Sequence, residues 1–516
     1  TFGLRLLGDH EVKVGAELQR VSMDLATGLT GGRVVSVLCP PVHVSPEGCD
    51  PGWTLYNHIA YLRQMPPGGA TDPDFASYIA DAIVVDVTST NEAVFLQDSW
   101  RVRPNLTLNL GLRWEGQKVP DYTGRTRIDL DDNWAPRLGF VWDPKGDGHA
   151  KVFGSWGRYF ETIPLHLVAW AFGVRTNAAV TSRSPDVVAC DPDFADVPGL
   201  CYAFGSDTRV VEDLKGESMD EFVLGGEVEA VRNLVVGARF LRRDVGRVVE
   251  DALLPDGSKL LGNPGRGELG TVYDFTGTWA YPAAEPKRTF TGVELTARKR
   301  FADGWQAQAS YLWSKLEGNY DGLYGAALGC VLPNACGEWD TAEWQINNAG
   351  YLTSDRRHTL KLDGAYTFPF GLTAGLSAHY RSGVPVRPMG YSLAWGPMYY
   401  SLSERGPWGF TDDEYEASLH LGFPFKVGPV RVNVLLDVFN LLNRQGETGR
   451  DMNYNLGETI EVIDYATGEV LPPIAAGTPC TAVVAPENAP LCNPRFNTTS
   501  TRQDARSVRL GLRLTF

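Results

Sequence analysis

Long hydrophobic runs are absent from this sequence. No stretch of about 18 consecutive residues is apolar, which excludes a protein that crosses a membrane with helices. Basic charge is also scarce, because the net charge is -15, and a nucleic-acid binder needs a basic face that displaces counterions. Disorder is excluded in turn, since 43% of the residues are hydrophobic and 11% are aromatic.

Catalytic motifs are lacking as well. The sequence contains no G-x-S-x-G, no H-E-x-x-H and no G-x-x-x-x-G-K-[ST]. The eight histidines are scattered, and none stands at a convincing ligand spacing from a cysteine or a carboxylate. We therefore predict that the chain is not an enzyme.

The eight cysteines fall into four close pairs in segments rich in Pro, Gly and Asp. Short local disulfides are the simplest of many connectivities, and they favour an oxidising compartment outside the cytoplasm. A zinc site from Cys39, His43, Cys49 and His58 is the alternative, but its spacing matches no common zinc finger. The predicted disulfides are Cys39–Cys49, Cys190–Cys201, Cys330–Cys336 and Cys480–Cys492.

Alternation of apolar and polar residues is the main structural signal. At the C-terminus, Val508, Leu510, Leu512 and Leu514 share one face of a predicted strand, while Arg509 and Arg513 share the other. An apolar face opposite an arginine-bearing face suits a membrane β-barrel, with lipid outside and a wet or plugged lumen inside. The same split recurs in many segments, and it predicts lumen-facing charges at Arg113, Glu227, Glu229, Arg431, Asp437, Arg509 and Arg513.

The connections between these strands alternate in length. Seven are short and carry turn residues; they lie near 8–10, 103–105, 143–148, 231–233, 302–304, 369–371 and 427–429. Seven are long, and all four cysteine pairs lie in them; they run over 25–89, 117–133, 161–215, 246–287, 319–354, 384–412 and 442–501. Short turns at one end and long loops at the other are typical of outer-membrane barrels, in which the long loops are extracellular. The short turns and the C-terminus would then be periplasmic.

The strand count is odd. Seven hairpins and the terminal segment Arg502–Phe516 give fifteen antiparallel strands, whereas bacterial single-chain barrels have even numbers. In a closed fifteen-stranded barrel the first and last strands would run parallel. We therefore expect additional strands between Thr1–Gly8 and the last strand, because open edges in lipid are costly.

Several segments carry a family resemblance: NEAVFLQDSWRVRPNLTLNLGLRWE at 91–115, NWAPRLGFVWDPKGDGHAKVFGSWGRYFETI at 133–163, DRRHTLKLDGAYTFPFG at 355–371, DVFNLLNR at 437–444 and the terminal Phe516. Together they resemble TonB-dependent outer-membrane receptors, and among them the Oar-like subgroup with a carboxypeptidase-regulatory-like domain. The resemblance implies a barrel of about 22 strands, a plug in its lumen and a TonB-contacting segment. No plug and no N-terminal domain can be seen in the sequence, so residues 1–516 are expected to be the C-terminal part of a transmembrane β-barrel.

The long loops offer two kinds of candidate binding residue. Loops 25–89, 161–215 and 319–354 each hold four more acidic than basic residues, and Asp191, Asp193 and Asp196 could bind Ca²⁺. The alternative is a solvated acidic surface that divalent ions bridge to lipopolysaccharide; no other cofactor is expected. Exposed aromatics could contact a ligand, or they could pack the loops together or form the interfacial girdle. The candidates are Trp339, Trp344, Tyr391, Trp395, Tyr399, Tyr400 and Trp408.

The sequence favours an outer-membrane TonB-dependent receptor that imports a bulky solute, such as a peptide or a glycan, through a plugged barrel. Its expected partners are outer-membrane lipid and a TonB-type energy-coupling complex, reached through the absent N-terminal part. One rival is a structural barrel that presents its loops to a surface lipoprotein or an exported protein. The other is a passive porin.

Overall fold

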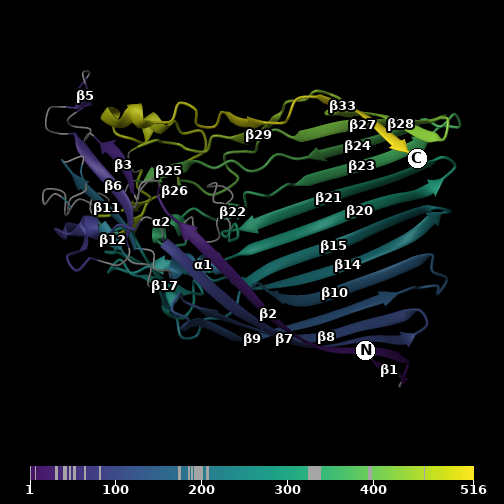
Figure 1. Ribbon diagram of the computed structural model, residues 1–516, viewed down its shortest axis with the longest axis horizontal. Coiled ribbons are helices and arrows are strands. Elements are labelled where there is room, and N and C mark those ends of the chain that lie inside the picture. The colour runs from purple at the N-terminus through teal and green to yellow at the C-terminus, as the bar shows by residue number, and fades with distance from the viewer. Residues whose placement is uncertain are drawn as a thin grey trace.

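The computed structural model describes residues 2–5, 7–29, 33–38, 44–45, 48–49, 54–62, 66–80, 83–172, 176–183, 186, 190, 202–204, 208–323, 339–392, 398–457 and 460–516. One large antiparallel sheet dominates it, in the order β1-β2-β7-β8-β9-β10-β14-β15-β20-β21-β23-β24-β27-β28-β33, with the short β22 beside β21 (Figure 1). These fifteen strands in sequence order confirm the predicted barrel wall. Among the described residues, no helix is long and apolar enough to cross a membrane.

The wall strands have unequal lengths, and the longest reach well beyond a bilayer. Their bounds are β1 Phe2–Arg5, β2 Asp9–Thr27, β7 Ile83–Arg103, β8 Leu106–Pro120, β9 Thr126–Trp142, β10 Ala150–Phe160, β14 Ser218–Val231, β15 Leu234–Arg247, β20 Arg288–Ala302, β21 Trp305–Gly318, β22 Gly350–Tyr351, β23 His358–Thr367, β24 Thr373–Arg381, β27 Glu414–Val427, β28 Val430–Phe439 and β33 Ser507–Thr515.

All seven predicted short turns are confirmed, and they lie at one end of the sheet together with both chain ends (Figure 1). We call this end the turn end, and the opposite one the loop end. Six of the seven predicted long connections are confirmed at the loop end. The seventh is wrong, because β8 and β9 continue to Pro120 and Thr126 and only residues 121–125 join them. Asp121 closes that tight turn by accepting hydrogen bonds from Thr123 and Arg125.

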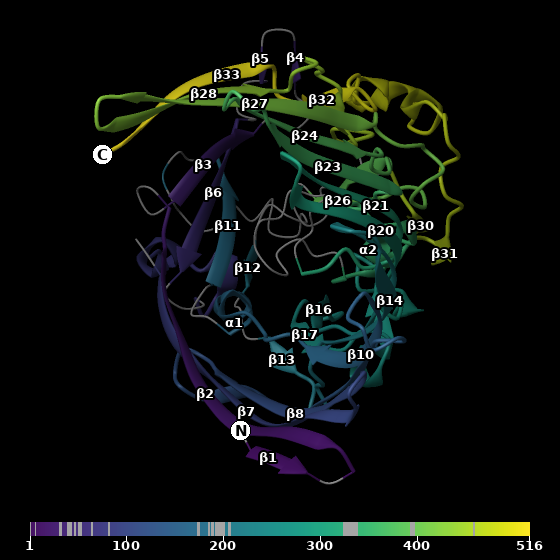
Figure 2. The same ribbon diagram turned by 90° about the vertical axis from the view of Figure 1, so that its right-hand side faces the viewer.

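The sheet is curved but not closed (Figure 2). The edge strands β1 and β33 do not pair with each other, as expected from the odd strand count. β1 covers only residues 9–12 of β2, so most of the outer edge of β2 has no strand beside it in the described part of the chain. Whether further strands complete the wall stays a prediction.

Alternation places apolar side chains on the convex face. In β33, Leu510 is 77% and Leu512 is 64% exposed, and both point away from the interior. On β2, Met23 and Leu25 belong to the opposite face, because they pack against a cluster around helix α1, which lies within the curve of the sheet in end-on view (Figure 2). The face that carries Met23 is therefore the inner face of the wall.

The long connections carry small elements of their own. Their bounds are β3 Arg33–Leu38, β4 Val44–Ser45, β5 Gly48–Cys49, β6 Leu55–Leu62, η3 Gly69–Thr71, η4 Phe75–Tyr78, α1 Leu165–Ala171, β11 Thr176–Ser182, β12 Tyr202–Phe204, β13 Arg209–Val210, β16 Glu250–Leu253, β17 Lys259–Gly262, η6 Gly267–Gly270, β18 Thr271–Tyr273, β19 Ala280–Pro282, α2 Ala342–Gln345, β25 Met389–Ser392, β26 Met398–Ser401, β29 Glu447–Arg450, β30 Ile463–Asp464, β31 Glu469–Val470, η8 Cys480–Ala482, η9 Pro486–Leu491 and β32 Thr499–Arg502. Together they form what we call the loop layer.

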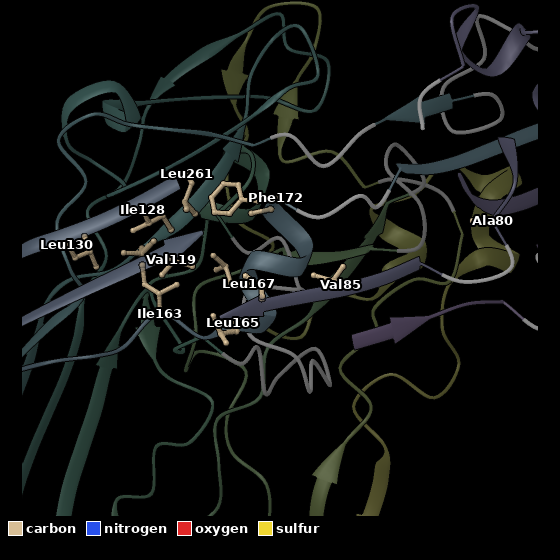
Figure 3. Packing of buried hydrophobic residues seen from close by; sticks show 13 residues of the cluster. Ala80, Val85, Val119, Ile128, Leu130, Ile163, Leu165, Leu167, Phe172 and Leu261 are labelled. Carbon is tan, nitrogen blue, oxygen red and sulfur yellow. The ribbon is translucent and has the colours of Figure 1, made fainter. Parts of the chain in front are cut away.

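The hydrophobic core lies at the loop end rather than inside the wall. Its first cluster packs α1 and Ile163 against inner-face residues of the strand extensions, among them Val85, Val119 and Ile128 (Figure 3). Val119 and Ile128 are buried and face each other across β8 and β9. Burial of these side chains explains why β8 and β9 stay paired so far from the turn end, although their register shifts between Glu115 and Gln117 and between Val119 and Pro120.

Candidate functional site: the inner wall and the loop layer

The inner wall is lined by polar side chains that pair across neighbouring strands. Arg509 on β33 donates two hydrogen bonds to Asp437 on β28, at 2.8 and 2.9 Å, and Asp437 also bonds to His420 on β27 at 2.5 Å. Arg113 bonds to Glu17 at 3.0 Å and to Glu115 at 2.5 Å. Such ladders satisfy charges on a surface that faces water or another polar segment rather than lipid.

A shallow cavity of about 540 Å³ lies on this wall across strands β20 to β28. Its lining includes the polar inner-face residues Gln308, Asp363, Ser377, Ser418 and His420. Ser377 and Ser418 stand directly opposite each other in register, as do Leu376 and Leu419 on the outer face. The wall therefore offers hydrogen-bonding groups to a solute on one side and apolar side chains on the other.

Three of the predicted ligand-binding aromatics lie inside the loop layer. Trp339 and Tyr400 are 1% and 2% exposed, and Trp344 is 4% exposed. Trp344 packs edge-on against Phe275, with ring centroids 5.2 Å apart, and its indole N–H donates to the carbonyl of Tyr399. In this structure these three rings hold loops together, and they could contact a solute only after the loops rearrange.

The remaining aromatics are more accessible. Tyr391 and Tyr399 are half-buried and pack edge-on across β25 and β26, with centroids 5.4 Å apart. Trp408 is half-buried and packs against Tyr454 and Phe496. Trp395 lies outside the described residues. Ligand contact stays a prediction for these positions.

A buried ionic cluster joins two connections of the loop layer. The Asp321 carboxylate accepts a hydrogen bond from Arg405 at 2.6 Å and two from Thr353, and Arg387 approaches it at 3.9 Å. Asn348 accepts hydrogen bonds from both Arg387 and Arg405. Burial acts to raise the pKa of Asp321, but the two guanidinium groups and Thr353 outweigh it and hold the pKa below its usual value. Asp321 is therefore ionised near neutral pH.

A second buried ionic group links β16, β17 and the segment before α2. Lys259 bonds to Asp251 at 2.6 Å and to Asp340 at 3.0 Å. Burial and the neighbouring charge of Asp251 raise the pKa of Asp340 to about 6, although Lys259 opposes the shift. Together with the Asp321 cluster, this group ties connections from distant parts of the chain into one layer.

The cysteines and the acidic cluster are only partly described. Cys480 and Cys492 form the expected disulfide, with their Cα atoms 5.7 Å apart. Cys190 is buried and also disulfide-bonded, to a cysteine whose side chain is not described. Several predicted residues lie outside the described part of the chain. They are Cys39, Cys201, Cys330, Cys336, Asp191, Asp193 and Asp196, together with the side chain of Cys49. Where side chains are described, no group of three possible metal ligands is found.

The ionic clusters escaped the sequence analysis. Asp321 and Arg405 are 84 residues apart, and Asn348 and Arg405 are 57 apart. No local spacing signals such a contact, because the pairing depends on how separate loops fold over the wall. The only hint in the sequence is that loop 319–354 is acidic and contains no Lys or Arg, so its carboxylates need basic partners from other segments.

The wall consists of long antiparallel strands that are apolar outside and polar inside. Short turns lie at one of its ends and a thick loop layer lies at the other. These features define an outer-membrane β-barrel protein. The family model described as outer membrane beta barrel domain matches residues 123–381, and the model for the TonB dependent receptor-like beta-barrel matches residues 47–184. The chain belongs to the family of outer-membrane β-barrel domains, and it is similar to TonB-dependent receptors of the Oar-like subgroup.

Individual proteins are also similar to this chain. The TonB-dependent transporter Oar of Myxococcus xanthus is 31% identical over all of this chain, which spans about half (50%) of that protein. Similar solved structures include the outer membrane transporter YddB from Escherichia coli, at 11% identity and a TM-score of 0.46, covering 87% of this chain and 50% of that one. The siderophore receptor PiuA from Acinetobacter baumannii shows 13% identity and a TM-score of 0.45, covering 87% and 51%.

Proposed function

We propose that the protein acts in the outer membrane as a TonB-dependent transporter that takes up a bulky solute, such as a peptide or a glycan. The polar inner wall with its cavity is the observation that supports uptake, because a purely structural barrel has no need of a hydrogen-bonding cavity on its inner face. A plug in the lumen and an energy-coupling complex of the TonB type would drive transport. This chain would bind the solute and let it pass, and it would carry out no covalent chemistry.

The loop layer supports a second candidate function. Its buried ion pairs and packed aromatics make it a fixed surface rather than a set of mobile gates, and such a surface suits a stable partner such as a surface lipoprotein or an exported protein. Uptake and partner binding are compatible in one molecule. A passive porin fits less well, because the loop layer spans the loop end of the wall.

The cavity on the inner wall provides the test of uptake. Replacing Ser377 and Ser418 together by tryptophan fills it from inside, so the accumulation of labelled peptides and oligosaccharides by cells should fall several-fold. The matched control is the outward pair Leu360→Trp and Leu362→Trp on β23, which does not line the cavity and should leave accumulation unchanged. A protonophore should abolish accumulation in cells with the unaltered protein. Equal uptake with a filled cavity, or with the protonophore, would contradict active import through this lumen.

Orientation is a separate prediction. We expect the loop end to be extracellular and the turn end, with Phe516, to be periplasmic. A membrane-impermeant maleimide applied to intact cells should therefore label Ala466→Cys, in the exposed turn between β30 and β31, and should fail to label Lys145→Cys, in the exposed turn between β9 and β10. Lysed cells should label both. The opposite pattern in intact cells would reverse the proposed topology.

A further inference from the structure

Basic side chains gather where the wall enters the loop layer, and the register places two of them, Arg158 and Arg247, on its outer face. On β14, the outward residues Leu224 and Phe222 are 45% and 41% exposed, as expected of side chains in lipid. The next outward residue toward the loop end is Asp220, which binds Arg158 of β10 through two hydrogen bonds of 2.8 and 2.9 Å. The outer face thus changes from apolar to charged at Asp220, and this change marks the boundary of the membrane.

A buried asparagine fixes the backbone just above this boundary. Asn263 is 8% exposed, and its side chain accepts a hydrogen bond from the N–H of Lys215 and donates to the carbonyls of Lys215 and Val248. Its own carbonyl accepts a bond from the N–H of Arg266. Asn263 therefore joins two connections, 161–215 and 246–287, and these carry the basic residues Lys215, Arg247 and Arg266 at this point.

The charges at this point do not balance. Arg158 is paired with Asp220, and Lys215 with Asp132 at 2.9 Å. Arg247 and Arg266 form no ion pair within the described residues, and the buried Nε–H of Arg247 has no hydrogen-bond partner there. The charges that act most strongly on Arg247 are the like charges of Arg266 and Arg158, followed by the opposite charge of Asp132. Two cations held close together without counter-charges favour an anionic ligand.

We propose that Arg247 and Arg266, supported by Arg158 and Lys215, bind the phosphate group of a lipid headgroup in the surrounding leaflet. Guanidinium groups bind phosphate through paired hydrogen bonds, and the apolar surface of Phe222 and Leu224 directly below offers a place for acyl chains. The proposed orientation determines only which leaflet supplies the lipid, and that is the outer leaflet. It does not depend on solute uptake.

The test uses the full-length protein in detergent micelles. A bis-phosphorylated glycolipid of the lipid A type is titrated into it and bound lipid is counted by native mass spectrometry, with the dephosphorylated glycolipid and inorganic phosphate as separate probes. The double variant Arg247→Gln and Arg266→Gln should bind the phosphorylated lipid about tenfold more weakly, which corresponds to about 1.4 kcal/mol. The control variant Arg20→Gln removes an exposed arginine from the outer face of β2, and binding should stay unchanged.

Three outcomes would overturn the proposal. Binding of the dephosphorylated glycolipid as tight as that of the phosphorylated one would remove the phosphate from recognition. Inorganic phosphate bound as tightly as the lipid would point to a soluble anion instead. Unchanged lipid binding in the double variant, with its heat-dependent gel mobility preserved as evidence of folding, would place the lipid elsewhere. Because no outcome involves transport, a failure here is distinguishable from a failure of the uptake proposal.

Discussion

Replacing Arg405 by alanine should destabilise the loop layer by about 3–5 kcal/mol, because the variant leaves a buried carboxylate without its main counter-charge. The Arg405 side chain is 1% exposed and that of Asp321 is 3% exposed, so water cannot replace the lost guanidinium. Asn348 would lose one of its two arginine partners as well. Hydrogen–deuterium exchange should show the loss as faster exchange over residues 339–392 and 398–413, while the wall strands keep their protection.

The matched control is Arg209→Ala. Arg209 also pairs with a carboxylate, that of Glu268 in the loop layer, but their side chains are 56% and 43% exposed. An exposed pair of this kind contributes at most about 1 kcal/mol, so exchange in the loop layer should barely change. If both variants loosened the loops equally, the Asp321 cluster would not be what holds the two connections together.

Trp344→Ala should be nearly as damaging. Trp344 belongs to the cluster that packs α2 against Phe275, Tyr400 and residues 460–463, and removing a buried aromatic of this size costs about 3–5 kcal/mol. We expect earlier cleavage of the loop layer by a protease added to intact cells. Tyr391→Ala is the control, because Tyr391 is only half-buried and its removal leaves a smaller cavity.

The same pair of variants separates packing from ligand contact. If Tyr391 contacts the solute, Tyr391→Ala should weaken solute binding while protease resistance is kept. Trp344→Ala should lose both together, because its effect passes through the fold of the loops. Weaker binding in Trp344→Ala with full protease resistance would contradict the packing role and would favour direct contact by Trp344.

The wall could be predicted from sequence because its signals are local. A period of two along a strand and a Gly, Asn or Asp at a turn are visible within a few residues, as at Val231–Asn233, where Asn233 adopts a φ of 69°. The error at 117–133 has the same origin. Beyond the membrane the outer face of β8 and β9 turns polar, a pattern that favours a loop in the sequence alone, while Val119 and Ile128 continue the inner apolar face under the loop layer.

The loop layer could not be predicted in this way. The sequence shows that the loops are rich in aromatic residues, but burial divides these residues into packed rings such as Trp344 and accessible ones such as Tyr391. Which ring is buried depends on contacts with distant segments. The ionic cluster of Asp321 is of the same kind, because its side-chain partners Thr353, Arg387 and Arg405 are at least 32 residues away along the chain.

The longest-range hydrogen bonds of the loop layer constrain the order in which the protein can fold. The indole N–H of Trp279 donates to the carbonyl of Tyr465, and the Tyr281 hydroxyl donates to the carbonyl of Gly468, across 186 and 187 residues. Except for β33 and the short β22, each wall strand pairs with one neighbour across a short turn, so these hairpins can be added one after another with little loss of chain entropy at each step. The contacts between 279–281 and 465–468 have to wait for the last hairpins. Closure of the exterior surface is therefore a late event in biogenesis, and a chain stalled before its final strand would expose apolar loop segments to proteases and chaperones.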